Sequence, residues 1–155
     1  MSKLNKITFV VVFISLTSCS SDTDNSSNTH KAEYIINGGE HSLRLELTPT
    51  HLYLAEYSRE LILLKGDKVV KRIKLSSDSG GYADANLYRC TQNKYLVKGY
   101  FDSWLIDIES ASITEGECKK NEHFYLGVFR RSQNNPWKFY SRRQSPEVKL
   151  IPKGG

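Results

Sequence analysis

Short runs of alternating hydrophobic and polar residues recur along the chain, about eight to twelve residues apart. In segment 41–47, Leu43, Leu45 and Leu47 share one face of an extended strand, and charged side chains occupy the other face. No segment keeps a 3.6-residue apolar period over ten positions. The expected strands are 41–47, 51–57, 61–64, 68–75, 87–90, 95–101, 104–110, 123–129, 137–143 and 148–152. This pattern predicts an all-β protein, either a single small antiparallel sandwich or an up-and-down barrel of short strands.

The first 18 residues have a different pattern. Residues 1–6 contain two lysines and no acid, and residues 7–16 (ITFVVVFISL) are almost uninterrupted apolar residues. This arrangement is typical of a secretory signal peptide, and the apolar run is about half the roughly 20 residues that a membrane-spanning helix needs. The sequence Leu16-Thr17-Ser18-Cys19 follows. It resembles the lipobox of bacterial lipoproteins.

The resemblance covers only about the first 20 residues, and it implies a location in the cell. Cys19 would become the first residue of the mature chain, with a thioether-linked diacylglycerol and an amino-terminal fatty acid such as palmitate. Several acyl chains suffice for stable membrane anchoring, whereas a single chain is marginal. Ser20 stands where an inner-membrane retention signal usually has aspartate. We therefore expect a protein of the cell envelope, anchored in the outer membrane and facing the periplasm, with surface exposure as an alternative.

Composition then divides the chain into three parts. Residues 1–18 are the expected signal peptide, residues 19–32 a lipid-anchored flexible tether, and residues 33–155 a single β domain. The tether is expected to be flexible because residues 20–31 (SSDTDNSSNTHK) include no residue that could be buried in a core. The remaining segment of about 120 residues is long enough for one hydrophobic core.

Two further cysteines, Cys90 and Cys118, remain once Cys19 is assigned to the anchor. Because such a lipoprotein would mature in an oxidising compartment, we expect these two to form a disulfide. Closing the loop of about 29 residues would stabilise the fold by on the order of 3.5 kcal/mol in the chain-entropy model. The alternatives are two free buried thiols or a metal pair, although closely spaced cysteines and histidines typical of a metal site are lacking.

Charge is distributed unevenly along the chain, whose formal net charge is +5. From Cys19 to Leu126 there are 13 basic against 16 acidic residues, and from Gly127 to Gly155 seven against one. A basic segment can attract nucleic acid, anionic lipid or an acidic protein. Because secretion makes nucleic acid the least suitable of these, we expect a protein partner with an acidic surface.

The basic segment includes an aromatic hairpin over residues 124–143. On alternation, Trp137 and Phe139 point one way, and the residues between them point the other. The expected binding surface comprises Tyr125, Phe129, Arg131, Lys138, Tyr140 and Arg142. Tyr, Trp and Arg are the residue types that dominate interface hot spots. A solvated basic face over an aromatic core is the equally weighted alternative.

Possible catalytic residues are sparse. Asp78-Ser79-Gly80-Gly81 resembles the core of the G-D-S-G-G motif of chymotrypsin-like proteases, but the preceding glycine of that motif is replaced by Ser77. A solvated turn explains the segment more simply. The four histidines share no short spacing, and Asp107 and Glu109 fit an outward polar strand face. We expect no catalytic residue, no metal and no cofactor.

The sequence therefore predicts a lipid-anchored envelope protein that acts by binding another macromolecule, as immunity proteins, inhibitors and assembly factors do. A carrier of a small ligand in a lipocalin-like barrel is the alternative. An envelope hydrolase is the third possibility.

Overall fold

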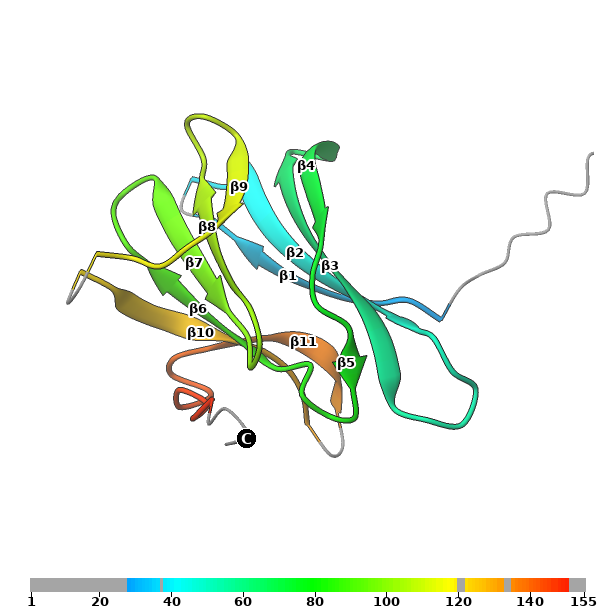
Figure 1. Ribbon diagram of the computed structural model, residues 1–155. Helices are drawn as coiled ribbons and strands as arrows, with labels where there is room; N and C mark the ends of the chain where they lie inside the picture. The colour runs from blue at the N-terminus through cyan, green and yellow to red at the C-terminus, as the bar shows by residue number, and fades with distance from the viewer. Residues whose placement is uncertain (1–27, 37, 120–121, 133–134, 151–155) are drawn as a thin grey trace, which may run out of the picture.

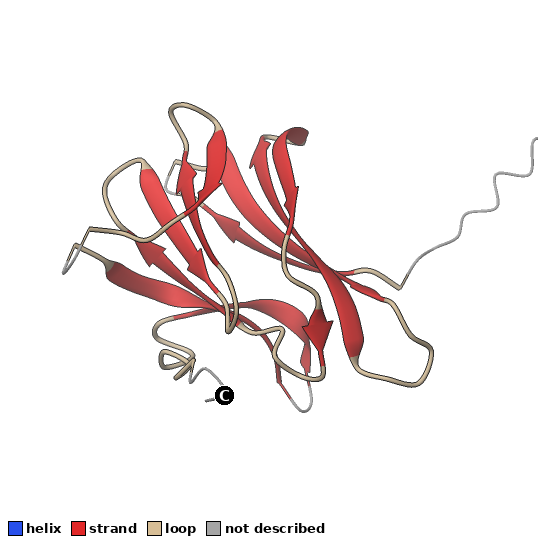
Figure 2. Ribbon diagram, in the orientation of Figure 1, coloured by secondary structure: helices blue, strands red, loops and turns tan. Residues whose placement is uncertain are grey.

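The computed structural model describes residues 28–36, 38–119, 122–132 and 135–150. Within these residues the chain forms only strands and loops, arranged as two facing antiparallel sheets (Figure 1, Figure 2). The strands are β1 (His30–Ile35), β2 (His41–Pro49), β3 (Glu56–Lys65), β4 (Lys68–Lys74), β5 (Asp78–Ser79), β6 (Ala85–Arg89), β7 (Lys94–Lys98), β8 (Ser103–Asp107), β9 (Ser112–Glu115), β10 (Phe124–Ser132) and β11 (Asn135–Ser141). The predicted all-β fold is confirmed.

The first sheet has the order β1-β2-β3-β4, and the short β5 pairs with β3. The second sheet has the order β11-β10-β6-β7-β8-β9. Every pairing is antiparallel. The two sheets are not joined into one closed sheet. Of the two predicted architectures, the protein therefore adopts the sandwich and not the barrel.

The core lies between the sheets and consists mainly of aliphatic side chains. Leu43, Leu45 and Leu47 of β2 are buried, as the alternation in segment 41–47 predicted. The opposite sheet contributes Leu87, Tyr95, Val97, Ile106, Phe129 and Trp137. The indole Nε1 of Trp137 donates a hydrogen bond of 3.0 Å to the carbonyl oxygen of Leu45. This bond ties β11 of one sheet to β2 of the other.

Two predicted strands were wrong, and three observed strands were not predicted. Segment 51–57 is largely a loop, because β2 continues to Pro49 and β3 begins only at Glu56. The described residues of segment 148–152, which are 148–150, form no strand. Strands β1, β5 and β9 were not predicted. The sequence of β1 (HKAEYI) looks too polar for a strand, and only its Ala32 is fully buried.

The domain begins earlier than the expected boundary at residue 33. β1 starts at His30, and its residues pair with β2 in the register Ala32 to Leu45. Residues 30–32 therefore belong to the sandwich and not to the tether. The expected signal peptide and Cys19 lie outside the described residues. No helix in the described ranges is long and apolar enough to cross a membrane.

The predicted disulfide is confirmed. Cys90 follows β6 and Cys118 follows β9, and the two residues are joined with their Cα atoms 5.5 Å apart. The bond links the centre of the second sheet to the segment that leaves its edge strand.

Candidate binding surface

The β10–β11 hairpin lies at one edge of the second sheet, and β10 pairs with both β11 and β6. The register of β10 against β6 shifts between Tyr125 and Gly127. Gly127 occupies this bulge with φ +157°, and a Cβ atom there would lie 2.2 Å from the carbonyl oxygen of Tyr140. Glycine is required because the backbone of β11 passes too close for any side chain. The bulge moves the side chains of the preceding residues to the opposite face of the sheet.

This bulge separates the three β10 residues that were expected on the binding surface, which are Tyr125, Phe129 and Arg131. Phe129 is fully buried between the sheets, so it belongs to the core and not to a binding surface. Arg131 shares the inward side of Phe129 and reaches the first sheet, where its Nη1 atom donates to the hydroxyl oxygen of Tyr57 at 3.3 Å. Its Nη2 atom lies 3.0 Å from Nε2 of His30. The prediction that Tyr125, Phe129 and Arg131 share one binding surface was wrong.

The predicted alternation of β11 is correct. Trp137 is buried in the core and Phe139 packs against it, so Lys138 and Tyr140 point outward. Outward-facing Arg130 pairs in register with Lys138. The Nζ atom of Lys138 lies 4.8 Å from the ring centroid of Tyr140. An ammonium group at this distance from an aromatic ring is attracted to its face.

Arg142 follows the end of β11 and lies over the ring of Phe124, an exposed residue at the start of β10. The guanidinium carbon of Arg142 is 4.4 Å from the ring centroid, and that of Arg89 is 5.6 Å away. The backbone N–H of Arg142 donates to the carbonyl oxygen of Leu126 at 2.8 Å. Phe124 and Arg89 were not predicted as surface residues, because neither lies on the expected face by simple alternation. We call Phe124, Arg130, Lys138, Tyr140 and Arg142 the basic aromatic surface.

The charges of this surface are weakly compensated within the protein. Arg130 has one ion pair, with its Nε atom 3.6 Å from Asp84. In the described part of the chain, no carboxylate oxygen lies within 4.0 Å of the cationic nitrogens of Lys138, Arg142 or Arg143. Exposed cations without a carboxylate partner create a field that attracts anions.

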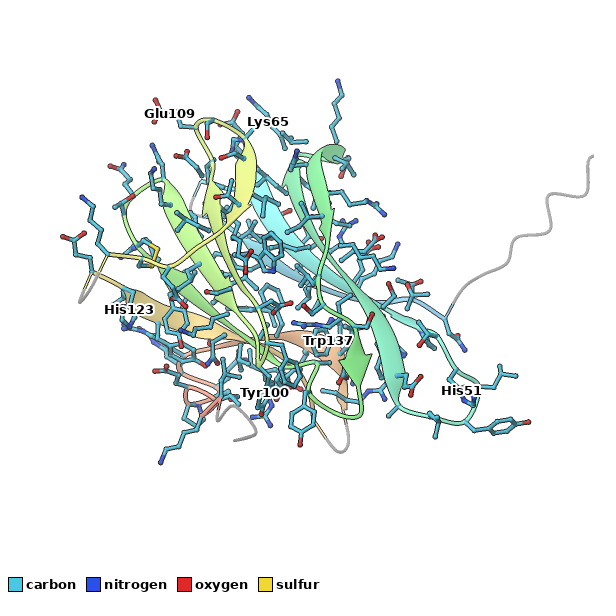
Figure 3. All side chains as sticks on the ribbon, viewed as in Figure 1. His51, Lys65, Tyr100, Glu109, His123 and Trp137 are labelled. Carbon is cyan, nitrogen blue, oxygen red and sulfur yellow. A yellow bond between two sulfur atoms is a disulfide. The ribbon has the colours of Figure 1, made fainter. Side chains whose placement is uncertain are left out.

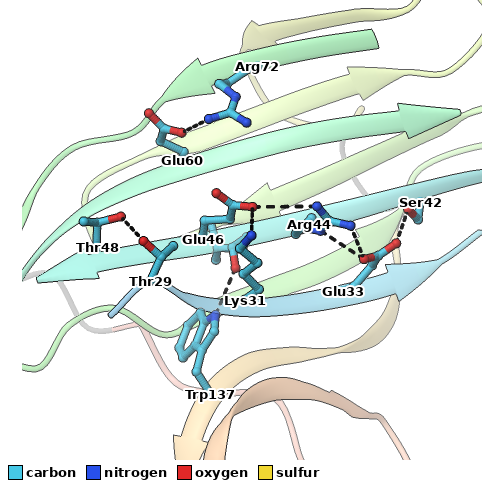
Figure 4. A network of polar contacts seen from close by, with 11 residues as sticks. Thr29, Lys31, Glu33, Ser42, Arg44, Glu46, Thr48, Glu60, Arg72 and Trp137 are labelled. Carbon is cyan, nitrogen blue, oxygen red and sulfur yellow. Dashed lines mark hydrogen bonds and ion pairs between the residues drawn. The ribbon is translucent and has the colours of Figure 1, made fainter. Parts of the chain in front are cut away.

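Several outward charges of the first sheet are paired with each other (Figure 4). Arg44 pairs with Glu33 at 2.9 Å and with Glu46 at 3.8 Å. Lys31 pairs with the same Glu46 oxygen at 3.8 Å, and Arg72 pairs with Glu60 at 2.7 Å. These pairs neutralise the charge of β1 to β3 locally, whereas Lys68, Lys71 and Lys74 of β4 form no ion pair within the described residues.

Tyr125 is directed to the C-terminal segment and not to an open surface. Its hydroxyl group donates to the carbonyl oxygens of Ser145 and Pro146 at 3.3 and 3.1 Å. Burial raises the pKa of Tyr125 to about 12, and the carboxylate of Glu147 adds to the effect. The neighbouring Tyr88 donates to Glu147 at 2.5 Å, and burial together with this bond raises the pKa of Tyr88. Both phenols are neutral donors that hold residues 145–148 on the sheet.

The other sequence candidates have structural partners. Asp78 accepts hydrogen bonds from the backbone N–H groups of Gly80 and Tyr82, which fits the predicted turn. Asp107 accepts from the N–H groups of Glu109 and Ser110 and pairs with Lys94 at 2.9 Å. The hydrogen bond from Lys94 lowers the pKa of Asp107. Among the residues that the structure covers, no three His, Cys, Asp or Glu side chains are grouped so that they could hold a metal ion.

Comparisons with known proteins identify no relative: no family model, no curated protein and no solved structure matches this chain.

Proposed function

We propose that this chain is a lipid-anchored cell-envelope protein that binds an acidic protein through its basic aromatic surface. The observation that carries the proposal is the combination of cations and rings on this surface: Lys138 and Arg142 lie on aromatic rings, and neither forms an ion pair with a carboxylate of the described residues. An acidic partner would supply the missing counter-charge. The anchor is carried by the resemblance of residues 16–19 to a lipobox.

The surface suits binding for two further reasons. Cation–π contacts hold Lys138 and Arg142 against rings, so less side-chain freedom is lost when a partner forms ion pairs with them. Tyr140 and Phe124 offer apolar area beside the charges, and aromatic residues next to arginine are typical of interface centres. The charged groups would steer the encounter, and the rings would prolong the complex.

The alternative of a small-ligand carrier has less support. A lipocalin-like carrier needs a closed barrel with an internal cavity. The described strands form two separate sheets, and large side chains such as Phe129 and Tyr95 fill the space between them. A hydrolase lacks support because the acidic candidates Asp78 and Asp107 are engaged in a turn and an ion pair.

Site-specific photocrosslinking in the producing cell tests the proposal. A photoreactive residue replaces the half-buried Tyr140 in one variant and Val70 in a control, because Val70 is exposed and lies on β4 of the other sheet. We expect the Tyr140 variant alone to crosslink one envelope protein, and we expect that protein to be acidic. Equal crosslinking from both positions, or a basic partner, would contradict the proposal.

A further inference from the structure

The loop between β2 and β3 exposes a cluster of large apolar side chains. Leu52 is 92% exposed, Tyr53 89% and Leu54 55%, which are unusually high values for such residues in a folded domain. Residues 47–55 (LTPTHLYLA) contain no Asp, Glu, Lys or Arg. We call residues 51–55 the apolar tip. Exposed apolar clusters of this kind mark sites that contact another molecule or a membrane.

The structure gives the apolar tip a defined conformation. Nδ1 of His51 accepts hydrogen bonds from the backbone N–H groups of Tyr53 and Leu54 at 3.1 and 3.2 Å. The N–H of Thr50 donates to the carbonyl oxygen of Glu56 at 3.0 Å and closes the base of the loop. His51 lies at the far end of the β2–β3 hairpin, away from Lys65 (Figure 3). The turn therefore holds Leu52 and Tyr53 at the extremity of the sandwich.

The chain enters the domain beside the same tip. Asn28, the first described residue, lines a shallow hollow together with His51, Leu52 and Leu54. Asn28 lies nine residue steps after Cys19, so an extended segment between them would reach about 30 Å at most. A lipid anchor at Cys19 would hold the tip close to the bilayer that carries it.

We propose that the apolar tip inserts into the interface of the lipid bilayer to which the chain is anchored. This inference rests on the anchor of the proposed function. Leu52 and Leu54 would bury their side chains at the boundary of headgroups and acyl chains. Tyr53 has the amphipathic ring that favours this depth, with its hydroxyl group among the headgroups.

Arg131 supports the same orientation. It is exposed at the base of the tip, where its guanidinium bonds to Tyr57, which lines the same hollow. A guanidinium group at this level can bond lipid phosphates while the leucines enter the bilayer. The residue that was wrongly expected on the basic aromatic surface thus has a place in this second contact.

Fluorescence quenching by brominated lipid tests the inference on the full, lipidated chain. The protein is reconstituted in vesicles of phosphatidylethanolamine and phosphatidylglycerol that contain brominated phosphatidylcholine. Tyr53→Trp reports on the tip and Val70→Trp on exposed strand β4, and the signal of Trp104 and Trp137 in the unsubstituted protein is subtracted. We expect the added fluorescence to fall by about half or more at position 53 and not at position 70, because quenching requires contact with the acyl chains.

Each other outcome has a separate meaning. Vesicle-bound protein without quenching at position 53 overturns the inference and leaves the anchor standing. Equal quenching at both positions also overturns it, since the domain would then lie flat on the membrane. If the full chain floats with vesicles no better than its Cys19→Ser variant, the anchor is wrong and the inference falls with it. Lipid-independent self-association that Leu52→Ser abolishes would assign the tip to a second copy of the chain instead.

Discussion

Arg59 and Asp102 form an ion pair inside the sandwich, with Nη1 and Oδ2 3.2 Å apart and side chains almost inaccessible to solvent. Arg59 comes from β3 and Asp102 from the turn between β7 and β8, so the pair joins the two sheets. The same Asp102 oxygen accepts the backbone N–H of Ser76 at 3.2 Å. The pair has space only because residue 99 is glycine: a Cβ atom on Gly99 would lie 2.4 Å from Oδ1 of Asp102. Such a buried pair contributes modestly while intact, but the loss of one partner leaves a buried charge uncompensated.

Asp102→Ala should therefore lower the free energy of unfolding by about 3 to 5 kcal/mol. Arg72→Ala is the matched control, because it removes an exposed pair with Glu60 and should cost less than about 1 kcal/mol. Denaturant unfolding of both variants is the measurement. Equal losses for the two variants would mean that the buried pair does not hold the sheets together.

Asp84 is the residue whose ionisation should affect stability most clearly. Burial raises its pKa from 3.8 to about 6, although Arg130 opposes the shift, and Asp78 contributes further to it. Between these two pH values the native state binds more protons at Asp84 than the unfolded chain does. The contribution of Asp84 to stability is therefore greatest at acidic pH and is lost as the pH rises to about 6.

Asp84→Asn should remove this dependence, because the amide does not ionise. We expect the stability of the variant relative to the unsubstituted protein to increase as the pH rises from about 4 to about 7. Glu40→Gln should give no such increase, since Lys65 lowers the pKa of Glu40. Thermal or denaturant unfolding across this pH range provides the comparison. A difference between Asp84→Asn and the unsubstituted protein that does not change with pH would contradict the assignment.

At the scale of elements, the β-bulge at Gly127 determines which residues of β10 are available for binding. The Cβ atom of an alanine there would meet the carbonyl oxygen of Tyr140 and the ring of Phe139, at 2.2 and 2.5 Å. Because the first of these is backbone, β11 would have to move. The bulge therefore couples the packing of β10 to the position of Tyr140 on the basic aromatic surface.

Gly127→Ala should destabilise the domain by on the order of 2 to 4 kcal/mol, from overpacking and backbone strain together. Gly116→Ala is a suitable control, since the nearest atom to its added Cβ is 3.8 Å away in Leu105. Amide exchange should also be faster in β11 of the Gly127 variant. A Gly127→Ala protein as stable as the Gly116 control, with unchanged exchange, would show that the bulge tolerates a side chain.

The same strands show which features of the fold could be predicted from the sequence. Alternation predicted the faces of β2 and β11 because no bulge interrupts the relevant stretch of either strand. Alternation failed on β10, because the bulge between Tyr125 and Gly127 places Tyr125 on the opposite face from Phe129. It also assigned segment 51–57 to a strand, because LYL has strand-like composition while its apolar side chains are exposed at a loop. Burial against a second sheet cannot be deduced from a local pattern alone.

The Arg59–Asp102 ion pair could not be predicted from the sequence for a related reason. Its partners lie 43 residues apart and on different sheets, so only the packing of the sandwich brings them together. The Cys90–Cys118 bond could be predicted because just two cysteines remained after Cys19. The small number of cysteines thus predicted a long-range contact that the hydrophobic pattern could not predict.

At the scale of the whole molecule, charge and apolar surface are segregated. Glutamates pair with Arg44 and Arg72 on the first sheet, Lys138 of the β10–β11 hairpin has no ion pair within the described residues, and the β2–β3 loop exposes uncharged apolar residues. If the β2–β3 loop contacts the membrane, the hairpin remains a second, chemically different contact. Two such contacts would orient an anchored domain toward its partner.

The most direct test of the proposed binding is the association rate with the protein crosslinked at Tyr140, measured from about 50 to about 500 mM salt. In the test variant Lys138 and Arg142 are both changed to glutamate, and in the control Lys68 and Lys71 of β4 are changed likewise. We predict that the hairpin variant associates at least about tenfold more slowly at low salt and loses most of its salt dependence, because exposed charges act mainly on the encounter. The β4 control should stay within about twofold of the unsubstituted protein. Equal association rates for a correctly folded hairpin variant and the unsubstituted protein would contradict the account, because the basic aromatic surface would then be a solvated face.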